Sequence, residues 1–223
     1  VEGDDACRKI CILASLAFGT HVYPRDVHTE GITHVTLGDV GYAEAWGGVI
    51  KLIGEVKTLE YGKIQIEVCP MFVSRESQLS SVDDVFNGIM VRGDATGDVV
   101  FYGKGAGKLP TASAVVADVI DCVKHFKARK YLFWEDAKPG YVEPYENMVE
   151  DVFIRAKGND SDAAFEVVEQ VFEGAERLIR REEEEGEIGF TVKDVKVKEL
   201  EARFARLKEL GVEPLNHIKI SDF

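Results

Sequence analysis

The sequence predicts an α+β fold built from two consecutive parts. A helix, one or two alternating strands, a hairpin and a second helix follow one another over residues 1–126. This order predicts a mixed α/β half with a mainly β-sheet core flanked by helices. Residues 145–223 follow the order βαββαβ, which is typical of a ferredoxin-like unit. Residues 127–144 are charged and contain Pro139, Gly140 and Pro144, so we expect a linker between two domains.

The first half opens on a predicted amphipathic helix, Asp4–Phe18, with Gly19 as its stop signal. The segment Asp39–Gly54 is expected to be helical, although it carries several glycines. Alternating apolar residues within Lys57–Ser74 predict one or two strands. These segments give the first half its helices and the beginning of its sheet.

A strand, a glycine turn and a helix are predicted over Asp98–Asp118. The β-branched and aromatic segment Asp98–Tyr102 has the composition of a buried strand, and it forms a predicted hairpin with Val85–Asp94. Three glycines then alternate with other residues at Gly103, Gly105 and Gly107. Pro110 marks the start of a helix that continues over Thr111–Phe126.

This glycine turn could seat a phosphate or a carboxylate, because helix N-terminal N–H groups attract anions and glycine admits a close approach. The turn matches neither a P-loop nor a G-x-G-x-x-G dinucleotide fingerprint. A glycine-rich connector that only permits tight packing is therefore the competing interpretation.

The second half contains strand and helix signals in alternation. The predicted strands and helices are, in order, Val149–Ala156, Ser161–Phe172, Ala175–Arg181, Glu187–Val192, Val195–Leu210 and Ile218–Ser221. Asp160 or Ser161 is a candidate N-cap for the first helix. An antiparallel sheet with both helices on one face is the usual result of this order.

Composition narrows the classes of function. The net charge of −13 argues against nonspecific binding to nucleic acid or to a membrane surface. The four cysteines do not have the spacing of a zinc site, so we expect no metal and a core that holds free thiols. These features indicate a cytoplasmic protein.

The first helix carries Asp5 and Lys9, whose i,i+4 spacing places them on one face. One interpretation is a surface ion pair worth at most about half a kcal/mol. The other is that this face borders a cleft, where a lysine can act as general acid towards a developing alkoxide. The aspartate would then hold the lysine or bind a substrate amine, and local sequence leaves both interpretations open.

Two motifs together resemble those of the homoserine dehydrogenases. The first is GDDACRKICILASLAFG, Gly3–Gly19, and the second is GDATGDVVFYGKGAGKLPTASAVVADVID, Gly93–Asp121. The short motifs EGI (Glu30–Ile32) and GVIKL (Gly48–Leu52) lie between them, as in that family. The resemblance covers residue 1 to about residue 126.

The resemblance implies an NAD(P)-linked interconversion of L-aspartate 4-semialdehyde and L-homoserine, in threonine and methionine biosynthesis. It implies that Lys9 is the catalytic acid/base and that Asp5 binds the substrate. It places Gly107 and Thr111 at the cofactor, which is NAD or NADP. A homo-oligomer is also expected.

The chain departs from the family pattern in two places. The family's nucleotide-binding Rossmann domain, which precedes the first motif, is absent from the sequence, so we expect a C-terminal fragment that is inactive alone. The second half resembles an ACT regulatory domain in its order of elements, but KGNDSD (Lys157–Asp162) replaces the usual D-x-P-G. An amino-acid effector such as threonine and a purely assembling module both remain open. The alternative function for the whole chain is a non-catalytic amino-acid-binding or oligomerisation module.

Overall fold

The computed structural model describes residues 1–128 and 133–223, and these form two compact units. The larger unit combines residues 1–74 with residues 134–223, and the smaller one spans residues 75–133. Each unit is described separately below. The mixed α/β architecture with a sheet core and flanking helices agrees with the predicted fold class.

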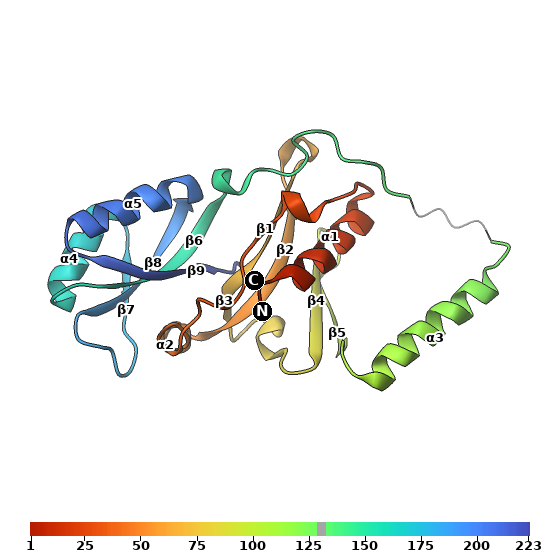
Figure 1. Ribbon diagram of the computed structural model, residues 1–223, viewed down its shortest axis with the longest axis horizontal. Helices are drawn as coiled ribbons and strands as arrows, with labels where there is room; N and C mark the ends of the chain where they lie inside the picture. Colours follow the sequence, from red (N-terminus) through yellow and green to blue (C-terminus); the bar gives the residue numbers. More distant parts are fainter. Residues whose placement is uncertain (129–132) are drawn as a thin grey trace. The chain divides into compact units, whose positions relative to one another are not determined.

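The larger unit is built on a seven-stranded sheet (Figure 1). Its strands are β1 (His28–Thr29), β2 (Gly48–Thr58), β3 (Ile64–Ser74), β6 (Val149–Lys157), β7 (Glu176–Leu178), β8 (Glu187–Lys196) and β9 (Glu213–Ile220). They follow the order β1-β3-β9-β6-β8-β7, and β2 also pairs with β3. Strands from both predicted domains therefore lie in one sheet. The domain boundaries 1–126, 127–144 and 145–223 stay predictions.

The first helix forms as predicted. Helix α1 spans Asp4–Phe18 and ends at Gly19, whose φ of 67° is left-handed. It packs its buried face on β2 and β3. The buried face includes Cys7, Ile10, Cys11 and Ala14. A Cβ added at Gly54 of β2 would lie 3.1 Å from Ile10 Cβ, so this glycine brings the helix close to the strand.

The predicted helix Asp39–Gly54 is wrong beyond its first half. Helix α2 covers Leu37–Trp46, and β2 begins at Gly48. Gly47, with a φ of 94°, ends the helix because it adopts the left-handed conformation that only glycine takes readily. A capping box between Thr36 and Asp39 fixes the other end.

The second half follows the predicted order β6, α4, β7, β8, α5 and β9, where α4 is Ser161–Val171 and α5 is Val197–Glu209. Its four strands are antiparallel to one another in the order β9-β6-β8-β7. Alternation along β6 separates two cores, because Val152 and Ile154 pack in the cluster that holds α4 and α5, while Phe153 packs with Tyr42 of α2. Both α4 and α5 therefore cover one face of these strands (Figure 1).

The smaller unit holds a hairpin and a helix. Strands β4 (Phe86–Gly93) and β5 (Gly97–Lys104) form the predicted hairpin, and α3 covers Lys108–Lys124. The prediction that Asp98–Tyr102 is buried is wrong, since Phe101 is 62% exposed. Every residue of β4, β5 and α3 is at least partly exposed, and Leu79 and Val82 lie close to Gly88 of β4. Part of the predicted linker, residues 129–132, lies outside the described residues.

The predicted free thiols are present, and three of them lie in the core. Cys7, Cys11 and Cys69 are buried, whereas Cys122 is exposed on α3. Burial raises the pKa of the Cys11 thiol to about 12, with the neighbouring Cys7 as the next cause. Cys11 is therefore a neutral packing group.

Candidate functional site

Asp5 and Lys9 form an ion pair on the first turns of α1. Lys9 Nζ lies 2.7 Å from Asp5 Oδ2, and the two side chains are 62% and 83% exposed. The hydrogen bond from Lys9 lowers the pKa of Asp5, and the positive charge of Lys9 acts in the same direction. The pair is thus preformed, and both side chains are exposed to solvent.

The start of α1 is held by backbone contacts with the segment that follows β1. Gly3, with a φ of 87°, precedes the helix, and a Cβ there would lie 2.9 Å from Thr29 Cγ2. A Cβ at Gly31 would lie 2.3 Å from Val1 O, and Ile32 N donates to that same oxygen at 3.0 Å. The EGI motif therefore has a local structural role, because Gly31 lets the chain pass against the residues that lead into the Asp5–Lys9 helix.

Gly107 and Thr111 lie together at the start of α3. Gly107 has a φ of 115° and is the N-cap residue, and Thr111 N donates to Gly107 O at 3.1 Å. No side chain caps this helix end among the described residues. Lys108, the first residue of α3, adds positive charge next to the free N–H groups. Such an end suits a phosphate or another anion.

The structure brings each predicted pair together, Asp5 with Lys9 and Gly107 with Thr111. The two pairs belong to different compact units. The structure describes the geometry within each pair. The functional roles of all four residues stay predictions.

The sequence analysis missed a concentration of buried charge inside the larger unit. Lys219 of β9 is surrounded by three glutamates, and these are Glu55, Glu67 and Glu150. The only available signal was that Glu55 and Glu67 occupy strands whose other residues are mostly apolar. Their meeting with residues 150 and 219 depends on strand pairings that no local pattern reveals.

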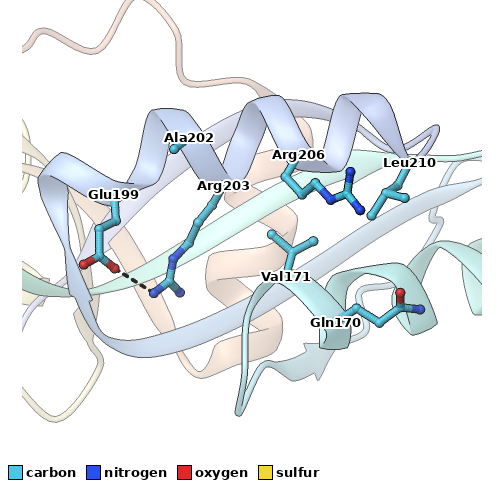
Figure 2. A pocket seen from close by; sticks show the side chains of 7 residues that line it. All are labelled: Gln170, Val171, Glu199, Ala202, Arg203, Arg206 and Leu210. Atoms are coloured by element: carbon cyan, nitrogen blue, oxygen red, sulfur yellow. Dashed lines mark hydrogen bonds and ion pairs between the residues drawn. The ribbon is translucent and has the colours of Figure 1, made fainter.

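A cleft of about 460 Å³ lies between α4 and α5 (Figure 2). Its lining residues are Gln170, Val171, Glu199, Ala202, Arg203, Arg206 and Leu210. Arg203 already pairs with Glu199 at 2.9 Å, and Arg206 pairs with Glu209 at 2.8 Å. A ligand carboxylate would have to compete with these exposed ion pairs, which are individually weak.

Neither a metal site nor a membrane span is found in the part of the chain that the structure describes. No group of three or more His, Cys, Asp or Glu side chains there is arranged to hold a metal ion. No helix within residues 1–128 and 133–223 is long and apolar enough to cross a membrane.

Comparison with known proteins gives one consistent result. The family model described as homoserine dehydrogenase matches residues 1–120, which include the Asp5–Lys9 helix and the glycine turn. The homoserine dehydrogenase of Synechocystis sp. is 48% identical over 126 residues, covering 55% of this chain and 29% of that protein. The Pseudomonas aeruginosa homoserine dehydrogenase is 44% identical over 124 residues, covering 56% of this chain and 28% of that protein.

Solved structures agree over the whole chain. A homoserine dehydrogenase from Thiobacillus denitrificans superposes with a TM-score of 0.83 at 28% identity, over 100% of this chain and 54% of that one. The S. aureus homoserine dehydrogenase at pH 6.0 gives a TM-score of 0.75 at 29% identity, again over 100% and 54%. The chain thus spans about half the length of the solved structures it matches. Because the family model covers more than half of its residues, the chain belongs to the homoserine dehydrogenase family.

Proposed function

We propose that this chain supplies the substrate-binding and proton-transfer part of an NAD(P)-dependent homoserine dehydrogenase. The reaction is the interconversion of L-aspartate 4-semialdehyde and L-homoserine, a step of amino-acid biosynthesis. The observation that carries the proposal is the preformed, exposed Asp5–Lys9 pair within the segment that matches the family.

The chemistry of this pair suits carbonyl reduction. Reduction of an aldehyde to an alcohol requires a hydride at the carbon and a proton at the oxygen. The Lys9 ammonium can donate that proton to the developing alkoxide, and it takes the proton back from the hydroxyl in the reverse reaction. Asp5 holds the ammonium in place and offers a carboxylate to a substrate amine.

The cofactor NAD or NADP would supply or accept the hydride when bound. The turn before α3 fits an anionic part of such a cofactor, because Gly107 carries no Cβ and the helix end is uncapped by any described side chain. Gly107 and Thr111 are the residues that we assign to this contact.

The isolated chain is proposed to be inactive. Its sequence contains no G-x-G-x-x-G turn between a strand and a helix, so it lacks the fingerprint that holds a dinucleotide. We expect no oxidation of NADPH when the purified chain is mixed with L-aspartate 4-semialdehyde and followed by absorbance. Turnover by the chain alone would contradict this proposal.

The test of the whole proposal is to fuse this chain behind the nucleotide-binding domain of a matched relative. We expect semialdehyde-dependent NADPH oxidation by the fusion. A soluble, folded fusion that binds NADPH and does not turn over would favour the non-catalytic module instead.

A second candidate function belongs to the βαββαβ part, residues 145–223. The cleft between α4 and α5 offers an acidic group at Glu199 and basic groups at Arg203 and Arg206, which is a suitable combination for a free amino acid. Threonine is the effector to test by equilibrium dialysis with the purified chain. An ACT-like regulatory domain should bind it, whereas a purely assembling module should not.

Association into a homo-oligomer is proposed from the smaller unit. A two-stranded hairpin is marginally stable alone, and β4–β5 exposes apolar side chains at Ile89, Val91, Val99 and Phe101. Pairing with a second copy would bury them. We also propose a cytoplasmic location, since the buried cysteines are free thiols.

A further inference from the structure

Three buried carboxylates surround one buried ammonium in the larger unit. Lys219 Nζ is in ion-pair contact with Glu67, lies 3.1 Å from Glu55 Oε2 and lies 3.6 Å from Glu150 Oε1. The four side chains are at most 11% exposed. We call these four residues the Lys219 cluster.

The Lys219 cluster lies where the two groups of strands in the sheet join. Glu55 comes from β2, Glu67 from β3, Glu150 from β6 and Lys219 from β9. The parallel pairing of β3 with β9 rests on only two register pairs, Met71–Lys219 and Phe72–Ile220. Strands β1–β3 are thus joined to the antiparallel strands β9-β6-β8-β7 by a short ladder with the cluster beside it. We call this junction the seam.

The charges of the cluster do not balance when every group is ionised. Three carboxylates and one ammonium leave two excess negative charges. Lys57 lies 3.1 Å from Glu55 on the rim, where its side chain is 38% exposed, and it also pairs with the more exposed Asp222 at 3.0 Å, so it compensates at most one of the two charges. The remaining buried negative charge would cost several kcal/mol, and a bound proton removes that cost.

Glu150 is the group placed to hold that proton. Its Oε1 atom has no hydrogen-bond partner among the described residues and is buried. It borders a cavity of about 10 Å³, which has room for about one water molecule. Burial raises the pKa of Glu150 to about 8, and the negative charge of Glu67 is the next cause. Lys219 opposes this effect on Glu150 and holds the pKa of Glu67 below its ordinary value against the effect of burial.

The other titratable groups around this cavity come from several elements, and these are Glu30, Cys69, Tyr145 and His217. Burial raises the pKa of Cys69 and of Tyr145. Burial lowers the pKa of His217, so its imidazole is neutral near pH 8. Compared with Cys69, Tyr145 and His217, Glu150 is therefore the group whose charge changes between pH 7 and pH 9.

We propose that the Lys219 cluster is a proton-dependent latch, in which one proton shared by Glu150 and Glu67 keeps the β3–β9 seam closed. When the proton leaves, the carboxylates repel one another across the seam and the junction weakens. This device is independent of the proposed dehydrogenase function. It would make the attachment of the βαββαβ part to β1–β3 sensitive to pH.

The direction in which the stability of the seam changes with pH follows from proton linkage. A carboxyl whose pKa is higher in the folded than in the unfolded state stabilises the fold fully below its unfolded value. That stabilisation is lost as the pH rises through the folded value, which is about 8 for Glu150. The seam should therefore open more easily as the pH rises towards 8, with no further contribution from this proton above that value.

The test is hydrogen exchange of the purified 223-residue chain between pH 6 and pH 9, corrected for the intrinsic exchange rate. Ser221 N donates to Phe72 O at 2.9 Å across the seam, so its protection reports seam opening. We expect this protection to fall by up to about tenfold per pH unit, the limit for one proton, between pH 6 and about pH 8, and to level off above that. Amides between β6 and β8, away from the seam, should change less.

Glu150→Gln keeps the shape of a protonated carboxyl and cannot ionise, so seam protection in this variant should be independent of pH after the same correction. Glu146→Gln is the matched control, since Glu146 is exposed and four residues away. Equal pH dependence in Glu150→Gln and in the native chain would overturn the proposal, as would constant protection in the native chain. If Glu150→Gln does not fold, carbon-13 NMR of the native Glu150 carboxyl decides, because a titration midpoint near 4.5 contradicts the latch and one near 8 supports it.

Discussion

At the scale of single residues, the Asp5–Lys9 pair contributes little to the stability of the fold. An ion pair with side chains 62% and 83% exposed adds little to the free energy of folding. Its neighbours on the same helix, Cys7 and Ile10, supply the packing. The i,i+4 spacing predicted the contact between the two side chains correctly, whereas their solvent exposure could be read only from the structure.

Gly107 is the residue whose backbone most restricts substitution at the glycine turn. Its φ of 115° costs any other residue about 1–3 kcal/mol. In the active fusion, we expect Gly107→Ala to raise the KM for NADPH by about tenfold, which corresponds to about 1.4 kcal/mol. The measurement is steady-state kinetics at saturating semialdehyde.

The control for this prediction is Gly103→Ala. Gly103 has no positive φ, and a Cβ added there would meet nothing within 4 Å. An unchanged KM in Gly107→Ala, or an equal rise in Gly103→Ala, would remove the glycine turn from the cofactor site.

At the scale of elements, buried ion pairs join α2 to the C-terminal strands. Asp39 is fully buried, and its Oδ1 accepts from Arg155 Nε of β6 at 2.8 Å. Its Oδ2 accepts from Asn216 Nδ2 of β9 at 3.0 Å. Arg155 also contacts Glu187 of β8, which pairs with Arg180. One aspartate thus caps its own helix and anchors that helix to the sheet.

We expect Asp39→Ala to lower the free energy of unfolding by about 3–5 kcal/mol, because it removes the carboxylate that accepts from Arg155 Nε and leaves this largely buried guanidinium with only the longer contact to Glu187 as an ion pair. Urea unfolding of the isolated chain gives this value. The comparison variant is Glu209→Ala, which breaks the exposed pair with Arg206 and should cost less than about 1 kcal/mol. Similar small losses in both variants would show that the buried network contributes no more than a surface pair.

The elements also show how far sequence patterns reach. Helix α1, the β4–β5 hairpin and the βαββαβ order followed from periodicity and turn residues. The segment Asp39–Gly54 is not one helix, because Gly47 and Gly48 do more than weaken its helical propensity. They instead end α2 and begin β2, whose pairing with β3 over its whole length outweighs local propensity.

At the scale of the whole molecule, the features that could not be predicted from the sequence are contacts between strands that are far apart along the chain. The Lys219 cluster gathers residues 55, 67, 150 and 219 through pairings that span the chain. The exposure of β5 could not be predicted from the sequence either, because a run of apolar residues predicts a buried strand whether or not another layer covers it. The candidate catalytic pair could be predicted from the sequence, because both of its residues lie within one helix.

The buried carboxyl also predicts how global stability depends on pH. The folded chain binds one more proton than the unfolded chain between the unfolded value of 4.5 and about 8 for Glu150. Glu150 should therefore make the free energy of unfolding fall with rising pH in this window, by at most about 1.4 kcal/mol per pH unit. Urea unfolding at pH 6 and pH 8 measures the slope, and Glu150→Gln should make it less negative. An unchanged slope in Glu150→Gln would contradict a proton held at this position.

Proton transfer by Lys9 in the homoserine dehydrogenase reaction is the core of the proposed function, and kcat of the fusion carrying Lys9→Ala tests it. We expect a loss of about 100-fold or more, the usual contribution of a general acid. Arg8→Ala, which removes an exposed cation from the neighbouring position, should leave kcat nearly unchanged. Equal activity of Lys9→Ala and the parent fusion would contradict the claim and leave Asp5–Lys9 as a surface ion pair.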